Sequence, residues 1–183
     1  MLADFVKFIL TILGAVFASL LSYELIEVGK KRKIETYWKI EAEYKSEAQQ
    51  TARKSIEEVT EALENQRFFL QKDFSADDLD KKLVDFYNTE FHYSNDKTKR
   101  DKAWGIRARI RFLNQMGVLL KKKMLDKDLL FNLIGLGFEI DHKTLSVILA
   151  AHRASHNTPY LYNYFEYLWA EYQKWKTKIS III

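Results

Sequence analysis

The sequence has no cysteine, one proline and six glycines among its 183 residues. The lack of cysteine excludes disulfides, thiolate metal sites and cysteine nucleophiles. So few prolines and glycines cannot supply the many tight turns of an all-β protein. Lys plus Arg exceed Asp plus Glu by only 29 to 25, and the four consecutive cations from Lys30 to Lys33 account for that excess. A basic balance of this origin points to anionic lipid headgroups before nucleic acid.

One long apolar run lies near the N-terminus. From Phe5 to Leu21 the only charged residue is Lys7, and a basic block follows the run. With Leu2 included the apolar span is about 20 residues, roughly 30 Å as a helix, which matches the hydrocarbon core of a bilayer. We therefore expect residues 1–28 to form a transmembrane helix that anchors the chain.

A cleavable secretory signal is the alternative for this run, because Val16-Phe17-Ala18 resembles a small-residue cleavage site. A signal peptide carries its cations ahead of the apolar core, whereas here Asp4 stands ahead and the basic block follows, which favours the anchor. The positive-inside rule then predicts a single-pass protein of the cell (inner) membrane with its C-terminal domain in the cytoplasm. The block that we expect against lipid headgroups consists of Lys30, Lys31, Arg32 and Lys33.

The chain after the anchor contains one long stretch, residues 34 to about 72, without glycine or proline. Its apolar stripe has helical spacing but is thin from Glu41 to Ser55, which fits a marginal coiled coil or a stalk that folds back onto the domain. We favour a stalk helix that continues the membrane helix, and assign residues 29–74 to the basic juxtamembrane segment and this stalk. Gly14 and Ala18 have the spacing that lets two membrane helices approach, which permits a homodimer through this face and the stalk.

Residues 75–176 predict a compact bundle of four to five helices, followed by an apolar tail at 177–183. Ser75, followed by acidic residues, is typical of a helix N-terminus, and that helix would run to about Phe91. A polar connection then leads to a strongly periodic helix from about Lys99 to Lys123.

Three further helices complete the predicted bundle. One begins at Asp126 or Asp128 and stops near two glycines at 135 and 137, and a second runs from a cap at Asp141 to Asn157. Thr158-Pro159 opens the third in the favoured order, a cap followed by proline at the first helical position. The sequence therefore predicts an all-α protein: a transmembrane helix, a stalk helix and a helical cytoplasmic domain.

An uncharacterised family resembles this chain over roughly residues 75–175. The likeness rests on the run RARIRFLNQMGVLLKKKMLDKDLLFNLIG, a helix that ends in Arg153, and the segment TPYLYNYFEYLWAEY. Its matching features are the Leu113-Asn114 helix, the basic-then-acidic turn at Lys121–Asp128, Arg153, and Tyr160 with Phe165-Glu166. The family is one of small prokaryotic proteins with one N-terminal membrane helix and a helical cytoplasmic domain of unknown function. The resemblance implies this architecture and no particular activity.

Four residues have spacings that occur in metal sites. His152 and His156 are four apart on one predicted helix, and Glu139 with His142 forms a Glu-x-x-His. The zinc-protease pattern needs a Glu directly after the first His, where Arg153 stands, and a di-iron bundle needs two Glu-x-x-His motifs. We therefore predict no metal or other cofactor, and interpret these histidines as polar groups near a helix end.

The helix from Lys99 carries cations that a nucleic-acid-binding protein would place against phosphates. Trp104 is the one aromatic residue nearby, and Asp96 and Asp101 dilute the positive charge. We predict a solvated face, or one turned to the anionic membrane surface. The cations are Arg100, Lys102, Arg107, Arg109 and Arg111, followed by Lys121, Lys122 and Lys123.

Eight aromatic residues lie between Tyr160 and Trp175, more than one buried stripe can hold. Helical spacing assigns a core stripe to Leu161, Phe165, Leu168 and Tyr172. The second stripe, which we predict to serve a partner, consists of Tyr162, Tyr167 and Trp169. Arg153 is predicted to form a structural ion pair with Glu166 or Glu171 across the last two helices.

No Ser-His-Asp order, phosphate-cradling glycine loop or carboxylate dyad is present in the sequence, so we predict no catalytic residues. We expect a single-pass membrane-anchored helical interaction protein, an adaptor, sensor or assembly component that acts at the cytoplasmic face through protein partners. Two alternatives are a membrane-tethered enzyme with a histidine-centred metal site and a nucleic-acid-binding protein at the membrane.

Overall fold

The computed structural model describes the backbone of residues 2–71 and 73–180, and the side chains of these ranges from residue 20 onward except at 77 and 180. The described chain is all-helical, without a strand, which confirms the all-α part of the predicted fold class. Its elements are α1 (Leu2–Tyr44), α2 (Glu47–Leu70), α3 (Ala76–Tyr87), the π-helical turn η1 (Asn88–His92), α4 (Lys97–Lys121), α5 (Lys127–His156) and α6 (Asn163–Ser180).

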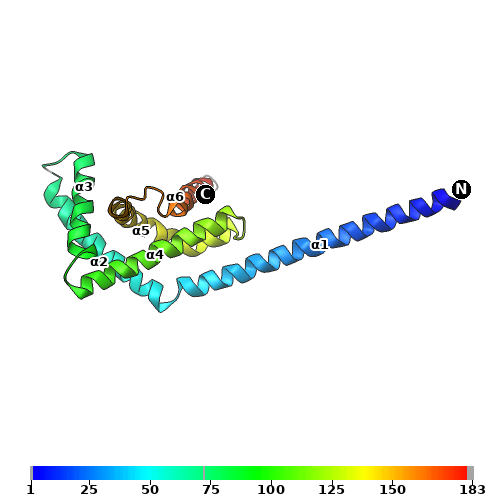
Figure 1. The fold of residues 1–183 in the computed structure, drawn as a ribbon, viewed down its shortest axis with the longest axis horizontal. Coiled ribbons are helices and arrows are strands. Elements are labelled where there is room, and N and C mark those ends of the chain that lie inside the picture. The colour runs from blue at the N-terminus through cyan, green and yellow to red at the C-terminus, as the bar shows by residue number, and fades with distance from the viewer. Residues whose placement is uncertain (1, 72, 181–183) are drawn as a thin grey trace.

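Helix α1 projects away from a bundle formed by α2 to α6 (Figure 1). It has 43 residues, which corresponds to a length of roughly 65 Å. Among the side chains described for α1, those that join the core lie at its C-terminal end, where Ile40 and Tyr44 are buried. The bundle therefore sits at one end of a long helix whose other end carries the apolar N-terminal run.

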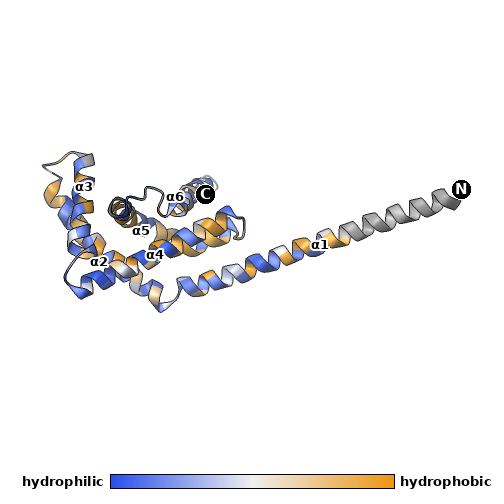
Figure 2. Cartoon of the chain, in the orientation of Figure 1, coloured by the Kyte–Doolittle hydropathy of each residue, from blue (hydrophilic) through white to orange (hydrophobic). Residues whose placement is uncertain are grey.

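In the part of the chain with described side chains, no helix is both long and apolar enough to cross a bilayer. Most side chains of the predicted span, residues 1–28, lie outside the described ones, as do those of Gly14 and Ala18. Figure 2 shows apolar residues on α1 beside that part of the helix, and a hydrophilic stretch nearer the bundle.

The predicted stalk is two helices, and its second half belongs to the bundle. The chain turns after Tyr44, and Ser46 caps α2 by accepting a hydrogen bond from the backbone N of Gln49 at 3.3 Å. Helix α2 packs on α4, α5 and α3, so the prediction of a continuous stalk to residue 74 is wrong. The apolar stripe of α2 is core: Ala52, Ile56, Val59 and Leu63 are buried.

Helix α5 is continuous through both glycines that we predicted to end it. A Cβ on Gly137 would lie 2.8 Å from Nη2 of Arg53 and 3.0 Å from Oη of Tyr44. A Cβ on Gly135 would lie 3.1 Å from the ring of Tyr172. These glycines allow neighbouring side chains to approach the helix closely, and Asp141 consequently lies inside α5 and not at its start.

Three other predicted helix ends are confirmed. Ser75 caps α3, and Asp126 caps α5 by accepting from two backbone N–H groups at 3.0 Å. Asn157 ends α5 in the left-handed conformation, with φ of 48°. Helix α4 begins slightly earlier than predicted, because Asp96 caps it.

Helix α6 begins at Asn163, five residues after the predicted Thr158 cap. Oδ1 of Asn114, on α4, accepts hydrogen bonds from the backbone N of Tyr164 at 3.0 Å and of Phe165 at 3.1 Å. The backbone of α6 also approaches α4 closely here, since a Cβ on Gly117 would meet the carbonyl oxygen of Tyr164 at 2.0 Å. Of the predicted core stripe, Phe165, Leu168 and Tyr172 are buried, and Leu161 is half-buried in the connection before α6.

Candidate functional site

Arg107 of α4 lies between two histidines that come from other elements of the bundle. Its Nε donates to Nε2 of His152 on α5 at 3.1 Å, and its Nη2 lies 2.9 Å from Nε2 of His92 in η1 and also contacts Nδ1 of that ring. The guanidinium lies over the indole of Trp104, with Cζ 5.0 Å from the ring centroid. Three elements far apart in the sequence therefore meet at one cation.

Both histidines are held neutral, as acceptors of these hydrogen bonds must be. Burial, reinforced by the charge of Arg107, lowers the pKa of His92 to about 4 and of His152 to about 3. Burial also lowers the pKa of Arg107 from its ordinary value. The arginine is thus the charged member of the cluster near pH 7.

Arg107 has no acidic partner among the residues that the structure describes. Besides the two histidines, the ionisable groups that act on it are Arg111 and three tyrosines, Tyr87, Tyr93 and Tyr162. Arg111, one turn further along α4, is exposed and donates from Nε to Oη of Tyr162 at 3.3 Å. Among the described residues, the site therefore carries two positive charges and no counter-charge.

Two further polar groups lie beside this cluster. Tyr87 is fully buried, its Oη has no hydrogen-bond partner within the described chain, and burial raises its pKa to about 12. His156 is exposed, with Nδ1 3.0 Å from the carbonyl oxygen of His152. No group of three or more potential ligand side chains that could hold a metal ion occurs in the described part of the chain.

The other two residues with metal-ligand spacing lie elsewhere on α5. Glu139 accepts from Oη of Tyr172 at 2.8 Å and pairs with Lys176. His142 stacks on Trp169, with ring centroids 3.6 Å apart and planes 11° apart, and burial lowers its pKa to about 4. The structure thus separates Glu139 and His142 from the pair His152 and His156.

A second polar cluster is buried where α1 turns into α2. Arg109 is fully buried, donates from Nη1 to Oε1 of Gln49 at 3.2 Å, and contacts Oδ2 of Asp141 at 3.4 Å. Its Cζ lies 4.9 Å from the ring centroid of Tyr44. The prediction that Arg109 lies on an exposed basic face is wrong, because this residue lies beside Ile106 on the buried side of α4. This cluster ties the α1–α2 turn to α4 and α5.

The three aromatic residues predicted to serve a partner are half-buried and pack against the core. Trp169 covers His142, as described above, and Tyr167 lies 5.5 Å from the ammonium of Lys121. Tyr162, in the connection before α6, has a left-handed backbone with φ of 60°. Only part of each ring is therefore accessible to a partner.

Arg153 and Glu166 lie together across α5 and α6. Nη1 of Arg153 is 2.5 Å from Oε1 of Glu166, and its Nε donates to the carbonyl oxygen of Leu161 at 3.0 Å. Their side chains are 21% and 56% exposed, so this pair lies at the surface and is not buried. Glu171, the other proposed partner, instead pairs with Lys127 and Lys174.

The basic block of α1 lies beside a second basic segment that sequence reasoning did not connect with it. The α4–α5 turn is the end of the bundle nearer to the N-terminus in Figure 1. A groove lies between this turn and α1. It is lined by Gly29, Arg32, Lys33, Thr36, Lys123 and Met124.

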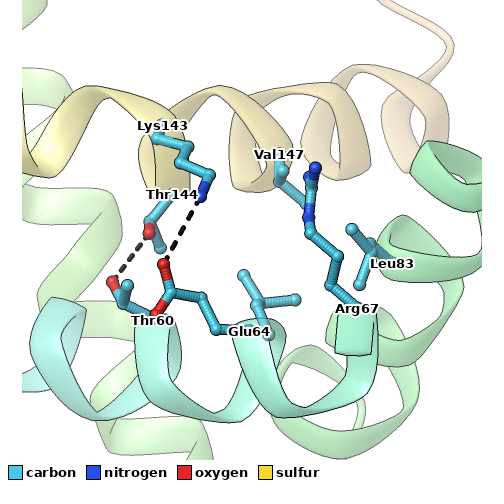
Figure 3. Close-up of a pocket in the computed structure, with 8 residues that line it drawn as sticks. Thr60, Glu64, Arg67, Leu83, Lys143, Thr144 and Val147 are labelled. Carbon is cyan, nitrogen blue, oxygen red and sulfur yellow. Dashed lines mark hydrogen bonds and ion pairs between the residues drawn. The ribbon is translucent and has the colours of Figure 1, made fainter. Parts of the chain in front are cut away.

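A small pocket between α2, α3 and α5 is shown in Figure 3. The hydroxyls of Thr60 and Thr144 are 2.7 Å apart, and Lys143 contacts Glu64 at 3.4 Å. Its volume of about 20 Å³ is room for roughly one water molecule. Because these polar groups already have partners, and Arg67 contacts Asp80 outside the pocket, we interpret it as a polar contact between helices and not as the candidate site.

Comparison with known proteins places the chain in a family. No curated protein and no solved structure shows significant similarity to it. A family described as "Domain of unknown function (DUF4760)" matches residues 9–175. The match extends well beyond residues 75–175, over which the sequence resembles an uncharacterised family, and includes α2 and most of α1. The chain therefore belongs to the DUF4760 family.

Proposed function

We propose that this protein is a single-pass membrane-anchored interaction protein, with its helical bundle on the cytoplasmic side of the cell membrane. The apolar run from Phe5 to Leu21 supports the anchor. On the described part of α1, apolar side chains at the end of the run and after it do not pack on the bundle: Leu20, Leu21, Leu25, Ile26 and Val28 are all exposed. A helix of this kind gains most of its stability from an apolar environment, which a bilayer supplies.

The observation that carries the proposal is the groove that brings Arg32 and Lys33 of α1 together with Lys123 of the α4–α5 turn. Cations near an anionic leaflet contribute about 1 kcal/mol each to attraction. Lys33 is seven residues before Ile40, the first buried residue among the described side chains of α1, which is about 10 Å along a helix. The bundle thus lies close enough to a membrane for both basic segments to act on it.

In this proposal the basic end of the bundle faces lipid headgroups, and the remaining surface is available to protein partners. The accessible edges of Tyr162, Tyr167 and Trp169 are the proposed contact, since Tyr and Trp often dominate interfaces. Pairing through Gly14 and Ala18 would present two bundles side by side. Such an arrangement suits an adaptor, sensor or assembly component.

A fluorescent label tests the basic end, because a chain without cysteine accepts a single engineered thiol. Full-length protein with Met124→Cys, labelled with an environment-sensitive dye, is reconstituted into vesicles with or without anionic lipid. We expect the dye to enter a drier environment in anionic vesicles, and to lose this response when Lys33 and Lys123 are changed to Gln.

The matched control carries the label at Asn95→Cys, an exposed position just before the other end of α4. Helix α4 has 25 residues, or about 37 Å, so this dye should report water in both vesicles. An equal response of the Met124→Cys label in neutral and anionic vesicles would contradict the proposed contact.

A further inference from the structure

We propose that Arg107 and Arg111 bind the phosphate group of a small soluble ligand. The two residues are four apart on α4 and so project from one face of the helix. Together they supply two positive charges, which match a phosphate dianion, and guanidinium groups bind phosphate through paired N–H donors.

Arg107 differs in its partners from two other arginines of the bundle. These two make contacts between helices, and each pairs with a carboxylate. Arg109 pairs with Asp141, and Arg153 pairs with Glu166. Arg107 is half-buried, and its partners among the described residues are two neutral histidine rings and the indole of Trp104. These rings fix the direction of the guanidinium but leave its charge uncompensated, which is the arrangement of a site that takes an anion from solution.

Several N–H groups of the two arginines are available to donate hydrogen bonds to that anion. The hydrogen bonds within the described chain use Nε and Nη2 of Arg107 and Nε of Arg111. Nη1 of Arg107 and both terminal nitrogens of Arg111 make no such bond, and Arg111 is exposed to solvent. One phosphate oxygen on each guanidinium would satisfy these groups.

The connection before α6 also contributes a residue, Tyr162, to this site. Tyr162 has a φ of 60°, a conformation that costs free energy for a residue with a side chain and that recurs at functional sites as well as at turns. Its Oη accepts from Arg111, so the left-handed turn holds a neutral polar group against the second arginine. The contact directs Arg111 without neutralising it.

Exposed aromatic rings flank the two arginines. Trp104 lies under the guanidinium of Arg107 and is 58% exposed. Tyr93 is 63% exposed, and its ring centroid is 4.2 Å from that of His92. Flat apolar surfaces beside a phosphate site suit a ligand that carries an aromatic group, such as a nucleotide base. Inorganic phosphate and a nucleoside monophosphate are therefore the two sources of the anion that need to be distinguished.

Calorimetric titration of the full-length protein in detergent micelles with inorganic phosphate, and separately with adenosine monophosphate, tests the proposal at low salt. We expect saturable binding of at least one anion, at one per chain. Arg111→Gln should weaken it at least about tenfold, because a charge-assisted pair is lost. Lys97→Gln removes the same charge from an exposed position at the start of α4 and should leave binding unchanged.

The remaining outcomes separate the sources and guard against unfolding. If the wild-type protein binds adenosine monophosphate more tightly than inorganic phosphate, and Trp104→Ala removes this difference, the ligand carries an aromatic group. If the wild-type protein binds both anions equally, the site recognises phosphate alone. Arg107→Gln should abolish binding, and if circular dichroism shows that this variant is unfolded, the exposed Arg111 carries the test. Absence of saturation with both anions up to about 10 mM, or wild-type affinity in Arg111→Gln, would overturn the proposal.

Discussion

Asn114 of α4 caps helix α6 from outside that helix, because its Oδ1 accepts from the backbone N of Tyr164 and of Phe165. An N-cap normally precedes its helix in sequence by one residue, whereas this one lies 51 residues before Phe165. The close approach of α6 to Gly117 on the same face of α4 makes the contact possible. The start of α6 is therefore defined by tertiary packing and not by Thr158-Pro159.

The first prediction concerns this cap. Asn114→Leu keeps the size of the side chain but leaves two backbone N–H groups without an acceptor, and should lower the free energy of unfolding by about 1–2 kcal/mol. Asn114→Asp keeps the acceptor and should cost much less. Urea unfolding followed by circular dichroism measures both. Equal stability of the Leu and Asp variants would show that the hydrogen bonds do not determine the helix start.

The second prediction concerns the buried pair Arg109 and Asp141. Arg109→Met leaves a carboxylate buried without its cation and should lower the free energy of unfolding by about 3–5 kcal/mol. The double variant with Asp141→Leu removes both charges and should recover most of that loss. The measurement is again urea unfolding, with unchanged dependence on denaturant as a control for two-state behaviour. A double variant as unstable as the single one would contradict the pairing.

Much of the fold could be predicted from sequence, because several helix ends are marked by local capping residues. The caps at Ser75, Asp126 and Asn157 act within one turn of their own helix, so single residues predict them. The turn before α2 had a signal that was missed, because Ser46 with Gln49 matches the Ser-x-x-Gln capping pattern. The side chain of Gln49 instead serves Arg109, a contact across 60 residues of sequence.

The candidate site could not be predicted from sequence for the same reason. His92 and His152 are separated from Arg107 by 15 and 45 residues, and no periodic pattern relates η1 to the end of α5. Glycine was ambiguous in a different way, since Gly137 looks like a helix end but serves close packing against Arg53. Residue spacing predicts the helices and their buried faces. Contacts between polar groups far apart in the sequence depend on how the helices pack, and only the structure shows them.

The third prediction is a loss of stability in weak acid. The pKa values of His92, His142 and His152 are lowered to between about 3 and about 4, so the unfolded chain binds their protons more tightly. Their contribution is fully present above about pH 6.5 and is lost as the pH falls towards the folded values. The melting temperature should drop between pH 7.5 and pH 5, a window above the range in which carboxylates titrate.

A pair of variants identifies the source of this pH effect. His152→Gln should flatten the drop in melting temperature, because it removes a buried group that must charge on unfolding. His156→Gln, at an exposed position of the same helix, should leave the profile as it is. A profile that both variants leave unchanged would contradict the assignment to His152.

The fourth prediction concerns the stack of Trp169 on His142. The ring of Trp169 keeps water from the imidazole, so Trp169→Ala should raise the pKa of His142 from about 4 towards its ordinary value. Phe165→Ala, in the core, should lower the free energy of unfolding by about 3–5 kcal/mol, and Trp169→Ala by less because its ring is half-buried. Nuclear magnetic resonance of the histidine ring protons measures the first effect. An unchanged pKa of His142 in folded Trp169→Ala protein would contradict the stack.

The anchor is the central claim of the proposed function, and extraction of membranes at alkaline pH tests it most directly. Full-length protein expressed in cells should remain in the membrane pellet after this wash, because a transmembrane helix is not released with peripheral proteins. Replacement of Leu10 and Leu20 by Arg places two charges in the apolar run and should release the chain. Recovery of the unmodified protein in the supernatant would contradict the membrane anchor.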